Sequence, residues 1–144
     1  MNATLADLTA IMHRFYSAET AYVEAGRQDF SVIAQLLHSE CTMHAPESLP
    51  YGGVWRGNEG FERWTQGFAD FWSKLEVFDP QFHEVGQNLL FIRSMARGTV
   101  RATGVEVEWP LLQQVRFESG LLAEIWPFYW DSAAIVAAMA PPQN

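Results

Sequence analysis

The sequence predicts one α+β domain in which a curved, mostly antiparallel sheet wraps around helices from the first half of the chain. Three observations support this fold class. Apolar residues recur at helical spacing in the first half of the chain. Four stretches with strand character follow, and short turn segments separate them. Helices followed by a run of neighbouring strands are typical of α+β folds.

Three helices are expected before the long strands. Apolar residues at helical spacing predict the first helix over residues 4–25, and Gly26 supplies a stop. Asp29 can cap a second, shorter helix that ends near Ser39. Asn58 can cap a third helix with a broad aromatic face. That face is expected to contain Phe61, Trp64, Phe68, Phe71, Trp72 and Leu75.

A short strand over residues 41–45 and a brief one at residues 54–55 flank a loop that contains Pro and Gly. The long strands are expected over residues 76–85, 89–103, 105–118 and 121–130. A hairpin turn is predicted at residues 119–120. Asp131 can then cap a last helix over residues 132–139.

Composition limits the classes of partner. Hydrophobic residues make up 49% of the 144 residues and charged residues 18%, as in an ordinary folded domain. Six Trp, ten Phe and four Tyr leave two interpretations open, a ligand cavity or the bulky filling of a small core. The formal net charge of -8 opposes binding to a phosphate backbone, and no polybasic run is present to hold an anionic membrane. We therefore expect neither a nucleic acid nor a membrane as partner.

The single cysteine, Cys41, excludes an internal disulfide and a thiolate metal site. A lone cysteine fits a reducing compartment. The first residues lack a basic segment followed by an apolar one, and no stretch approaches the roughly eighteen apolar residues of a membrane span. We expect a cytoplasmic protein with one domain over residues 1–144.

Three segments resemble one known family. Residues 42–57 (TMHAPESLPYGGVWRG) resemble the strand, loop and short strand of SnoaL-like polyketide cyclase relatives, within the nuclear transport factor 2 and ketosteroid isomerase superfamily. Residues 83–88 (HEVGQN) are similar to a second segment of these proteins, and residues 125–131 (IWPFYWD) to their last strand and the helix that follows. The matches occur in the family's order and cover the chain from end to end.

The resemblance implies a cone-shaped, cystatin-like α+β barrel with a mixed, mostly antiparallel sheet, and a homodimer that pairs through the outer sheet face. It also implies a hydrophobic cavity for a small apolar or aromatic molecule. Two functions stay open, because one fold supports many functions. One is a cofactor-free isomerase, cyclase, dehydratase or epoxide hydrolase, and the other is a binding or accessory domain without turnover. Matching to the family places Ala45 where the isomerase base stands and Gln113 where an acidic donor stands.

Three polar residues are candidates for catalysis. Gln113 is the only polar residue on the apolar face of the strand 105–118, where it needs a ligand or a side chain as partner. Glu19 interrupts the apolar stripe of the first helix, and the resemblance puts it in the place of the isomerase tyrosine. The alternative is a solvent-facing or helix-flanking carboxylate. His44 can act as a base near neutral pH. If Ala45 faces inward, however, strand alternation turns His44 away from the cavity.

Five aromatic residues are candidates for the substrate-binding walls, and core packing explains each of them equally well. They are Tyr16, Trp55, Trp109, Trp126 and Phe128. We expect the cavity to lie between Tyr16, Glu19, Trp55, Gln113 and Trp126. The four His residues show no metal-ligand spacing, and the sequence contains neither a Gly-rich phosphate loop nor a nucleophile elbow. We expect no metal and no cofactor.

Overall fold

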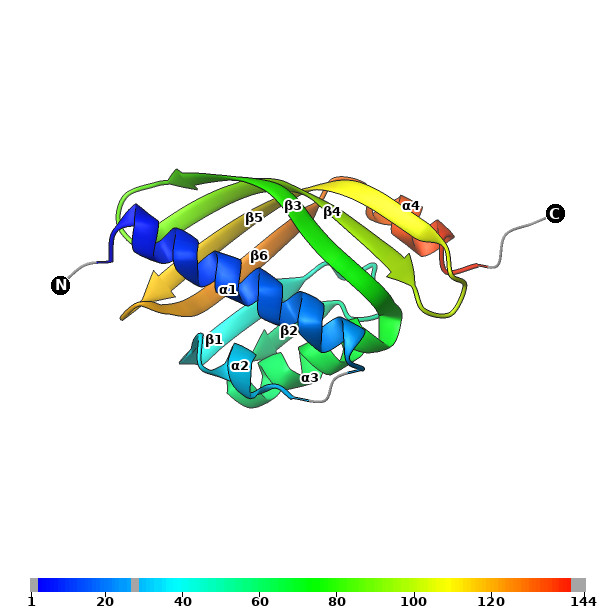
Figure 1. Ribbon diagram of the computed structural model, residues 1–144, viewed down its shortest axis with the longest axis horizontal. Helices are drawn as coiled ribbons and strands as arrows, with labels where there is room; N and C mark the ends of the chain where they lie inside the picture. Colours follow the sequence, from blue (N-terminus) through cyan, green and yellow to red (C-terminus); the bar gives the residue numbers. More distant parts are fainter. Residues whose placement is uncertain (1–2, 27–28, 141–144) are drawn as a thin grey trace.

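A strongly bent six-stranded sheet holds two of the helices against its concave side (Figure 1). The structure is a computed structural model and describes residues 3–26 and 29–140. The strand order is β2-β1-β6-β5-β4-β3. Neighbouring strands are antiparallel except for β1 and β6, which are parallel. The predicted α+β class with a mixed, mostly antiparallel sheet is confirmed.

The first three strands begin earlier than the sequence pattern predicts, while the last three begin within one residue of the predicted position. They are β1 (Leu37–Ala45), β2 (Gly53–Arg56), β3 (Trp72–Glu84), β4 (Leu89–Val100), β5 (Glu106–Glu118) and β6 (Leu121–Tyr129). The predicted turn between β5 and β6 is confirmed, because Ser119 and Gly120 both have positive φ, 53° and 74°. Two successive residues with positive φ are what a tight hairpin turn requires.

Helix α1 (Leu5–Glu24) carries the buried stripe that the apolar spacing predicts. It begins with a capping box, in which the side chains of Thr4 and Asp7 each accept a hydrogen bond from the other's backbone N–H. Gly26, with a φ of 72°, ends the segment. The helix packs against β3, where the hydroxyl of Thr20 donates to the carbonyl oxygen of Leu75.

Helix α2 (Ser31–Ala34) is a single turn, so the expected helix up to Ser39 is wrong. Asp29 does accept a hydrogen bond from the backbone N–H of Ser31 at 2.9 Å. The chain then enters β1 at Leu37, where it is already paired with β6. An isolated helix of one or two turns is marginal, and the ladder of the sheet offers its backbone a stronger set of hydrogen bonds.

Helix α3 (Gly57–Phe71) packs against β1 and ends before Trp72. The expected face is confirmed for Phe61, Trp64, Phe68 and Phe71, which are all buried. Trp72 and Leu75 belong to β3 instead, because the backbone turns extended at Trp72. Arg56 precedes the first helical residue, and the side chain of Asn58 donates to the carbonyl oxygen of His38 rather than capping the helix.

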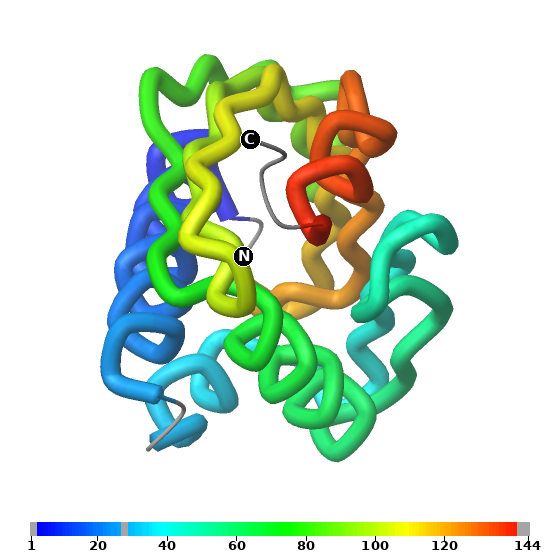
Figure 2. The backbone as a smooth tube through the Cα atoms, turned by 90° about the vertical axis from the view of Figure 1, so that its right-hand side faces the viewer, coloured from blue at the N-terminus to red at the C-terminus, as the bar shows by residue number. Residues whose placement is uncertain are grey.

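Helix α4 (Ser132–Ala137) follows the sheet directly. The carboxylate of Asp131 accepts a hydrogen bond from the backbone N–H of Ala134 at 3.2 Å, so the predicted cap is confirmed. The end-on view in Figure 2 shows the backbone as a ring, with α1 on one side, α3 below and the strands curving around the rest. Within the described part of the chain, every helix is too short or too polar to cross a membrane.

Candidate functional site

A small cavity of about 30 Å³ lies inside the ring, between the concave face of the sheet and the helices. Its wall includes Glu19, Trp64, Trp109, Gln113, Pro127 and Tyr129. These residues come from α1, α3, β5 and β6, so the fold brings together side chains from distant parts of the sequence. A volume of this size holds about one or two water molecules.

Glu19 is the buried carboxyl of this cavity. Its side chain lies on the inner face of α1 and is only 6% exposed. No hydrogen bond to its carboxyl group occurs among the described residues. Burial removes the carboxylate from water and raises the pKa of Glu19 to about 8. The interpretation of Glu19 as a solvent-facing carboxylate is therefore wrong.

Gln113 has a protein partner. The hydroxyl of Tyr16 on α1 donates a hydrogen bond to Oε1 of Gln113 on β5, and both side chains are buried. Burial and, to a smaller extent, the nearby charge of Glu19 raise the pKa of Tyr16 above its usual range. Tyr16 therefore touches the site through Gln113, while Gln113 itself lines the cavity.

The substitution Gln113→Leu is expected to lower the free energy of unfolding by about 1–3 kcal/mol, because it leaves the buried Tyr16 hydroxyl without an acceptor. From sequence alone the same substitution would be neutral or stabilising, since it removes a polar group from an apolar face. The double variant Tyr16→Phe/Gln113→Leu should recover most of the loss. Urea denaturation of the parent, the single variants Gln113→Leu and Tyr16→Phe, and the double variant measures the coupling. Additive effects would contradict the importance of this bond.

Two buried tyrosines form a second polar group of the site. The hydroxyls of Tyr51 and Tyr129 lie 2.9 Å apart, and the indole N–H of Trp72 donates to the Tyr51 hydroxyl at 3.2 Å. Burial raises the pKa of both tyrosines.

The sequence did not single out Tyr129 or Trp64 as site residues. The sequence pattern did predict that Trp64 lies on the buried face of α3. Its place at the cavity depends on how α3 packs against the sheet, which the pattern does not show.

His44 does not lie in this cavity. Met43 and Ala45 face inward on β1, so alternation turns His44 to the outer face of the sheet. There its ring stacks on Trp126 with centroids 3.6 Å apart, and Nε2 lies 2.9 Å from the carboxylate of Glu124. Of the two interpretations of His44, the structure supports the one that turns it outward.

Trp126 and Phe128 are also on the outer face, so their expected place in the cavity wall is wrong. The cause is a bulge in β6: Arg116 pairs with Glu124 and Phe117 with Leu122, which leaves Ala123 without a partner in β5. An extra residue reverses the alternation of the strand beyond it. Pro127 and Tyr129 consequently face the cavity, while His44, Trp126 and Phe128 line an outer groove of about 470 Å³.

Trp55 lies on the edge strand β2 and is half-buried against the core. Its indole N–H donates to the carbonyl oxygen of Tyr51 at 3.2 Å, and it does not line the cavity. Trp109 does line it, as expected. The sequence analysis expected five residues around the cavity. Two of these five, Glu19 and Gln113, line it.

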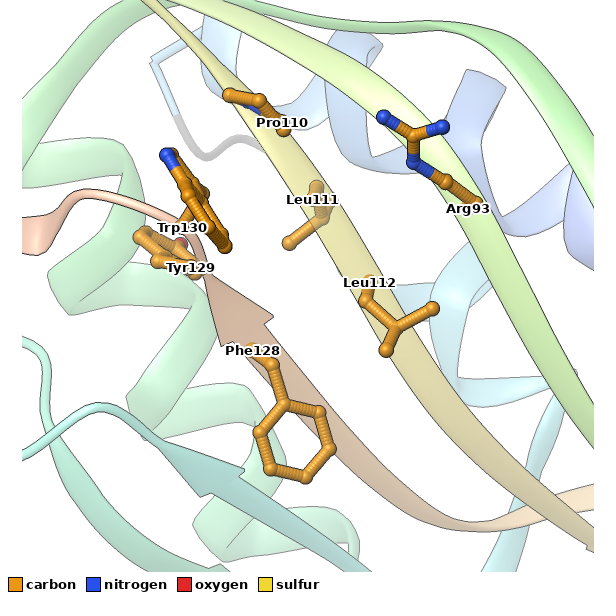
Figure 3. A pocket seen from close by; sticks show the side chains of 7 residues that line it. All are labelled: Arg93, Pro110, Leu111, Leu112, Phe128, Tyr129 and Trp130. Carbon is orange, nitrogen blue, oxygen red and sulfur yellow. The ribbon is translucent and has the colours of Figure 1, made fainter.

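Apolar side chains are exposed on the outer face along β5 and β6. This outer apolar patch consists of Leu112, Trp126, Phe128 and Trp130, and Trp130 is 81% exposed. Figure 3 shows Leu112, Phe128 and Trp130 beside a pocket of about 430 Å³, with the helices behind the sheet. Exposed apolar patches of this kind often mark an interaction surface.

Within residues 3–26 and 29–140, no three His, Cys, Asp or Glu side chains come together in a way that could hold a metal ion. The polar groups of the cavity are instead one carboxyl, one amide, a tyrosine hydroxyl and two indole N–H groups. Such a set can take up or release a proton at Glu19 and can donate hydrogen bonds to a bound molecule.

Comparison with known proteins agrees with this architecture. TerC co-crystallised with polyporic acid shares the fold with a TM-score of 0.77 and 13% sequence identity, over 92% of this chain and 98% of that chain. A protein from Jannaschia sp. CCS1, provisionally named a SnoaL-like polyketide cyclase, has a TM-score of 0.75 and 14% identity, over 95% of this chain and 94% of that chain. An NTF2-like protein of unknown function from Burkholderia pseudomallei has a TM-score of 0.75 and 17% identity, over 93% of this chain and 98% of that chain. None of the curated proteins compared matches the sequence.

At these identities the likeness to solved structures establishes the fold alone. The family is established by sequence, since the profile of the SnoaL-like domain matches residues 12–125. This match covers most of the chain, including α1 from Met12 onward, all of β1, α3 and β5, and the first half of β6. The chain therefore belongs to the SnoaL-like domain family.

Proposed function

We propose that this chain is a cofactor-free enzyme that moves a proton on a small apolar or aromatic metabolite, with Glu19 as the acid–base group. The observation that carries this proposal is the burial of the Glu19 carboxyl in a mostly apolar cavity, with its pKa raised to about 8. A group that titrates near neutral pH both takes and returns protons efficiently. Perturbed carboxyls in cavities of this kind are typical of active sites.

The proposed reaction class is isomerisation, cyclisation, dehydration or epoxide opening, each of which needs a proton transfer and no redox group. Gln113 supports the proposal as a neighbouring hydrogen-bond donor, because its amide nitrogen is free of partners among the described residues. Proteins of the same fold carry names from this chemistry, such as SnoaL-like polyketide cyclase. His44 does not enter this proposal, since it faces the other side of the sheet.

One observation favours a second candidate, a binding or accessory domain without turnover. The cavity of about 30 Å³ is far smaller than the few hundred Å³ of most ligand sites, so a metabolite must widen it on binding. A domain that only binds its ligand needs no base. The raised pKa of Glu19 is then a consequence of packing and not of a catalytic task.

A ligand screen followed by isotope exchange distinguishes the two candidates. Thermal-shift and native mass spectrometry screens would use polyketide, steroid and terpene-like compounds, together with polyporic acid because of the TerC structure. Compounds that bind are then incubated with the protein in D₂O. For an enzyme we expect deuterium in the bound compound at a C–H position, or product formation. Binding with neither result favours the accessory domain.

We also propose that the outer apolar patch joins two copies of this chain. Arg93 lies at the edge of the patch that is next to β4, and Glu47 lies beyond the opposite edge, next to β1. The face therefore has a positive charge on one side of the patch and a negative charge on the other. A two-fold rotation brings such a face onto itself without opposing like charges. A patch of exposed Trp and Phe supplies the apolar centre that homodimer interfaces have.

Light scattering tests the dimer. The parent is expected to have twice the 16.3 kDa mass of one chain at micromolar concentration, and Phe128→Glu is expected to return one chain's mass, because it puts a charge in the centre of the patch. Val85→Glu is the matched control, since Val85 is similarly exposed but lies outside the patch. A monomeric parent contradicts the proposal, and so does a Phe128→Glu variant that stays dimeric.

A further inference from the structure

His44 lies at the edge of the outer apolar patch and contacts two residues of β6. Its ring stacks on the indole of Trp126, with the two ring planes only 5° from parallel. Its Nε2 atom lies 2.9 Å from Oε2 of Glu124. His44 also lines one groove together with Trp126 and Phe128, two members of the patch. A second copy of the chain that covers the patch therefore also lies against His44.

The ion pairs around His44 leave one negative charge uncompensated while its ring is neutral. Arg116 on β5 lies 3.7 Å from the carboxylate of Glu124 and 3.4 Å from that of Glu118. One guanidinium is thus shared between two carboxylates. A protonated His44 supplies the second positive charge, so the group of four side chains becomes neutral.

The elements around His44 carry three further titratable or charged side chains. They are Glu47 in the loop after β1, Arg56 on β2 and His38 on β1. Among the described residues, none of the three forms an ion pair with His44 or Glu124. Glu47 adds to the negative charge of the groove, and Arg56 is exposed to water, which screens its charge. Helix α4 contributes the uncharged Ser132 to the groove.

Coverage of the patch removes more water from Glu124 than from His44. In the single chain the side chain of Glu124 is 30% exposed, whereas that of His44 is only 13% exposed. A carboxylate that loses its water needs a positive partner, because its charged form is otherwise disfavoured. The ring stack acts in the same direction, since a cation over the face of a tryptophan is attracted more strongly where water is excluded. Both effects favour a proton on His44 in the dimer.

We propose that His44, Glu124 and Trp126 form a proton switch that controls the association of two copies of this chain. This inference rests on the dimer proposed above. A histidine gains or loses its positive charge in the neutral pH range. With a neutral His44, each copy brings an uncompensated carboxylate to the interface, which opposes association. The dimer is therefore expected to hold at mildly acidic pH and to dissociate at alkaline pH.

Sedimentation equilibrium of the full chain at constant salt concentration measures this dependence. Because association takes up protons at His44, we expect the Kd of the dimer to rise about tenfold or more between about pH 6 and about pH 8.5. The salt concentration is fixed because salt screens charges that water still reaches. Circular dichroism at both pH values checks that the chain stays folded.

Two variants separate the charge of the switch from its shape. His44→Gln keeps an N–H donor beside Glu124 but cannot gain a charge, so its Kd should equal the high alkaline value of the parent at both pH values. Glu124→Gln removes the carboxylate that needs compensation, so its Kd should keep the low acidic value of the parent at both pH values. A merely structural contact would weaken the dimer in both variants.

His38→Gln is the matched control for these variants. His38 lies on the same strand as His44, and its Nε2 atom is 4.0 Å from the carboxylate of Glu118, but it does not belong to the patch. We expect this variant to keep the full rise of Kd with pH.

Four results overturn the switch while the dimer stands. One is a Kd that is the same at both pH values. Another is a Kd that falls as pH rises, which would mean that the loss of water from the His44 ring dominates. The third is a rise that His44→Gln retains, which would assign the proton to another group. The fourth is a Glu124→Gln variant that dissociates at alkaline pH as the parent does.

The switch, the dimer and the proposed reaction fail separately. A parent that is monomeric at both pH values overturns the dimer and the switch together. Turnover through Glu19 is measured on the internal cavity, so none of these results decides the proposed enzyme function.

Discussion

Replacement of Glu19 by Gln is expected to lower turnover of the true substrate by about 100-fold or more, the usual scale for the loss of a general base. The amide keeps the volume of the side chain but cannot take up a proton. In the parent, kcat/KM should rise with pH to a plateau with an apparent pKa near 8, the value of the buried carboxyl. The variant should lack this rise. Deuterium incorporation or product formation, followed across neutral and alkaline pH, measures both effects.

Glu24→Gln is the matched control for this experiment. Glu24 lies on the same helix as Glu19 but is exposed to solvent, so its charge is not needed in the cavity. We expect the control to turn over like the parent. A Glu19→Gln variant that keeps its fold and its turnover would assign the proton transfer to another group of the cavity.

The free energy of unfolding should also depend on pH through Glu19. The pKa of this carboxyl is about 8 in the folded protein, against 4.5 for an ordinary glutamate. Between these values the folded chain binds one more proton than the unfolded chain, so its stability falls as pH rises. The contribution is complete below about pH 4.5 and is lost as pH passes about 8. The total loss from this group is on the order of 5 kcal/mol, a large part of the stability of a small domain.

Urea denaturation of the parent and Glu19→Gln at about pH 5 and about pH 9 measures this effect. The variant has no carboxyl to ionise at this position, so its stability should fall less over the interval. Exposed carboxylates are the same in both proteins and cancel in the comparison. Parallel curves for the two proteins would mean that Glu19 ionises as easily in the folded chain as in the unfolded one.

Features of the fold that depend on a local pattern could be predicted from the sequence. The alternation of β5 placed Gln113 correctly on the inner face, because side chains of a strand face opposite sides in turn. The cap at Asp131 and the turn at Ser119 and Gly120 follow from the chemistry of single residues. Glu19 could be placed on the buried stripe of α1 by its spacing, but the lack of a hydrogen-bond partner for its carboxyl group among the described residues could not.

Features that depend on pairing between distant segments could not be predicted in the same way. Nothing in the sequence around Ala123 signals the bulge that turns Trp126 and Phe128 outward, because it arises from the register with β5. Trp72 fits the apolar spacing of α3 as well as it fits the start of β3, and its strand partner Val100 decides between them. The roles of Trp64 and Tyr129 likewise depend on which side chains meet across the cavity.

The parallel pairing of β1 with β6 governs the order of events when the chain folds. All other neighbouring strands follow one another along the sequence, whereas His44 on β1 and Glu124 on β6 are 80 residues apart. Closing so long a loop is slow compared with forming hairpins, because its entropic cost precedes the contacts that compensate it. During synthesis, the pair of strands β1 and β2 can join the rest of the sheet only after β6 has been made. The cavity that holds Glu19 therefore closes only after β6 has left the ribosome.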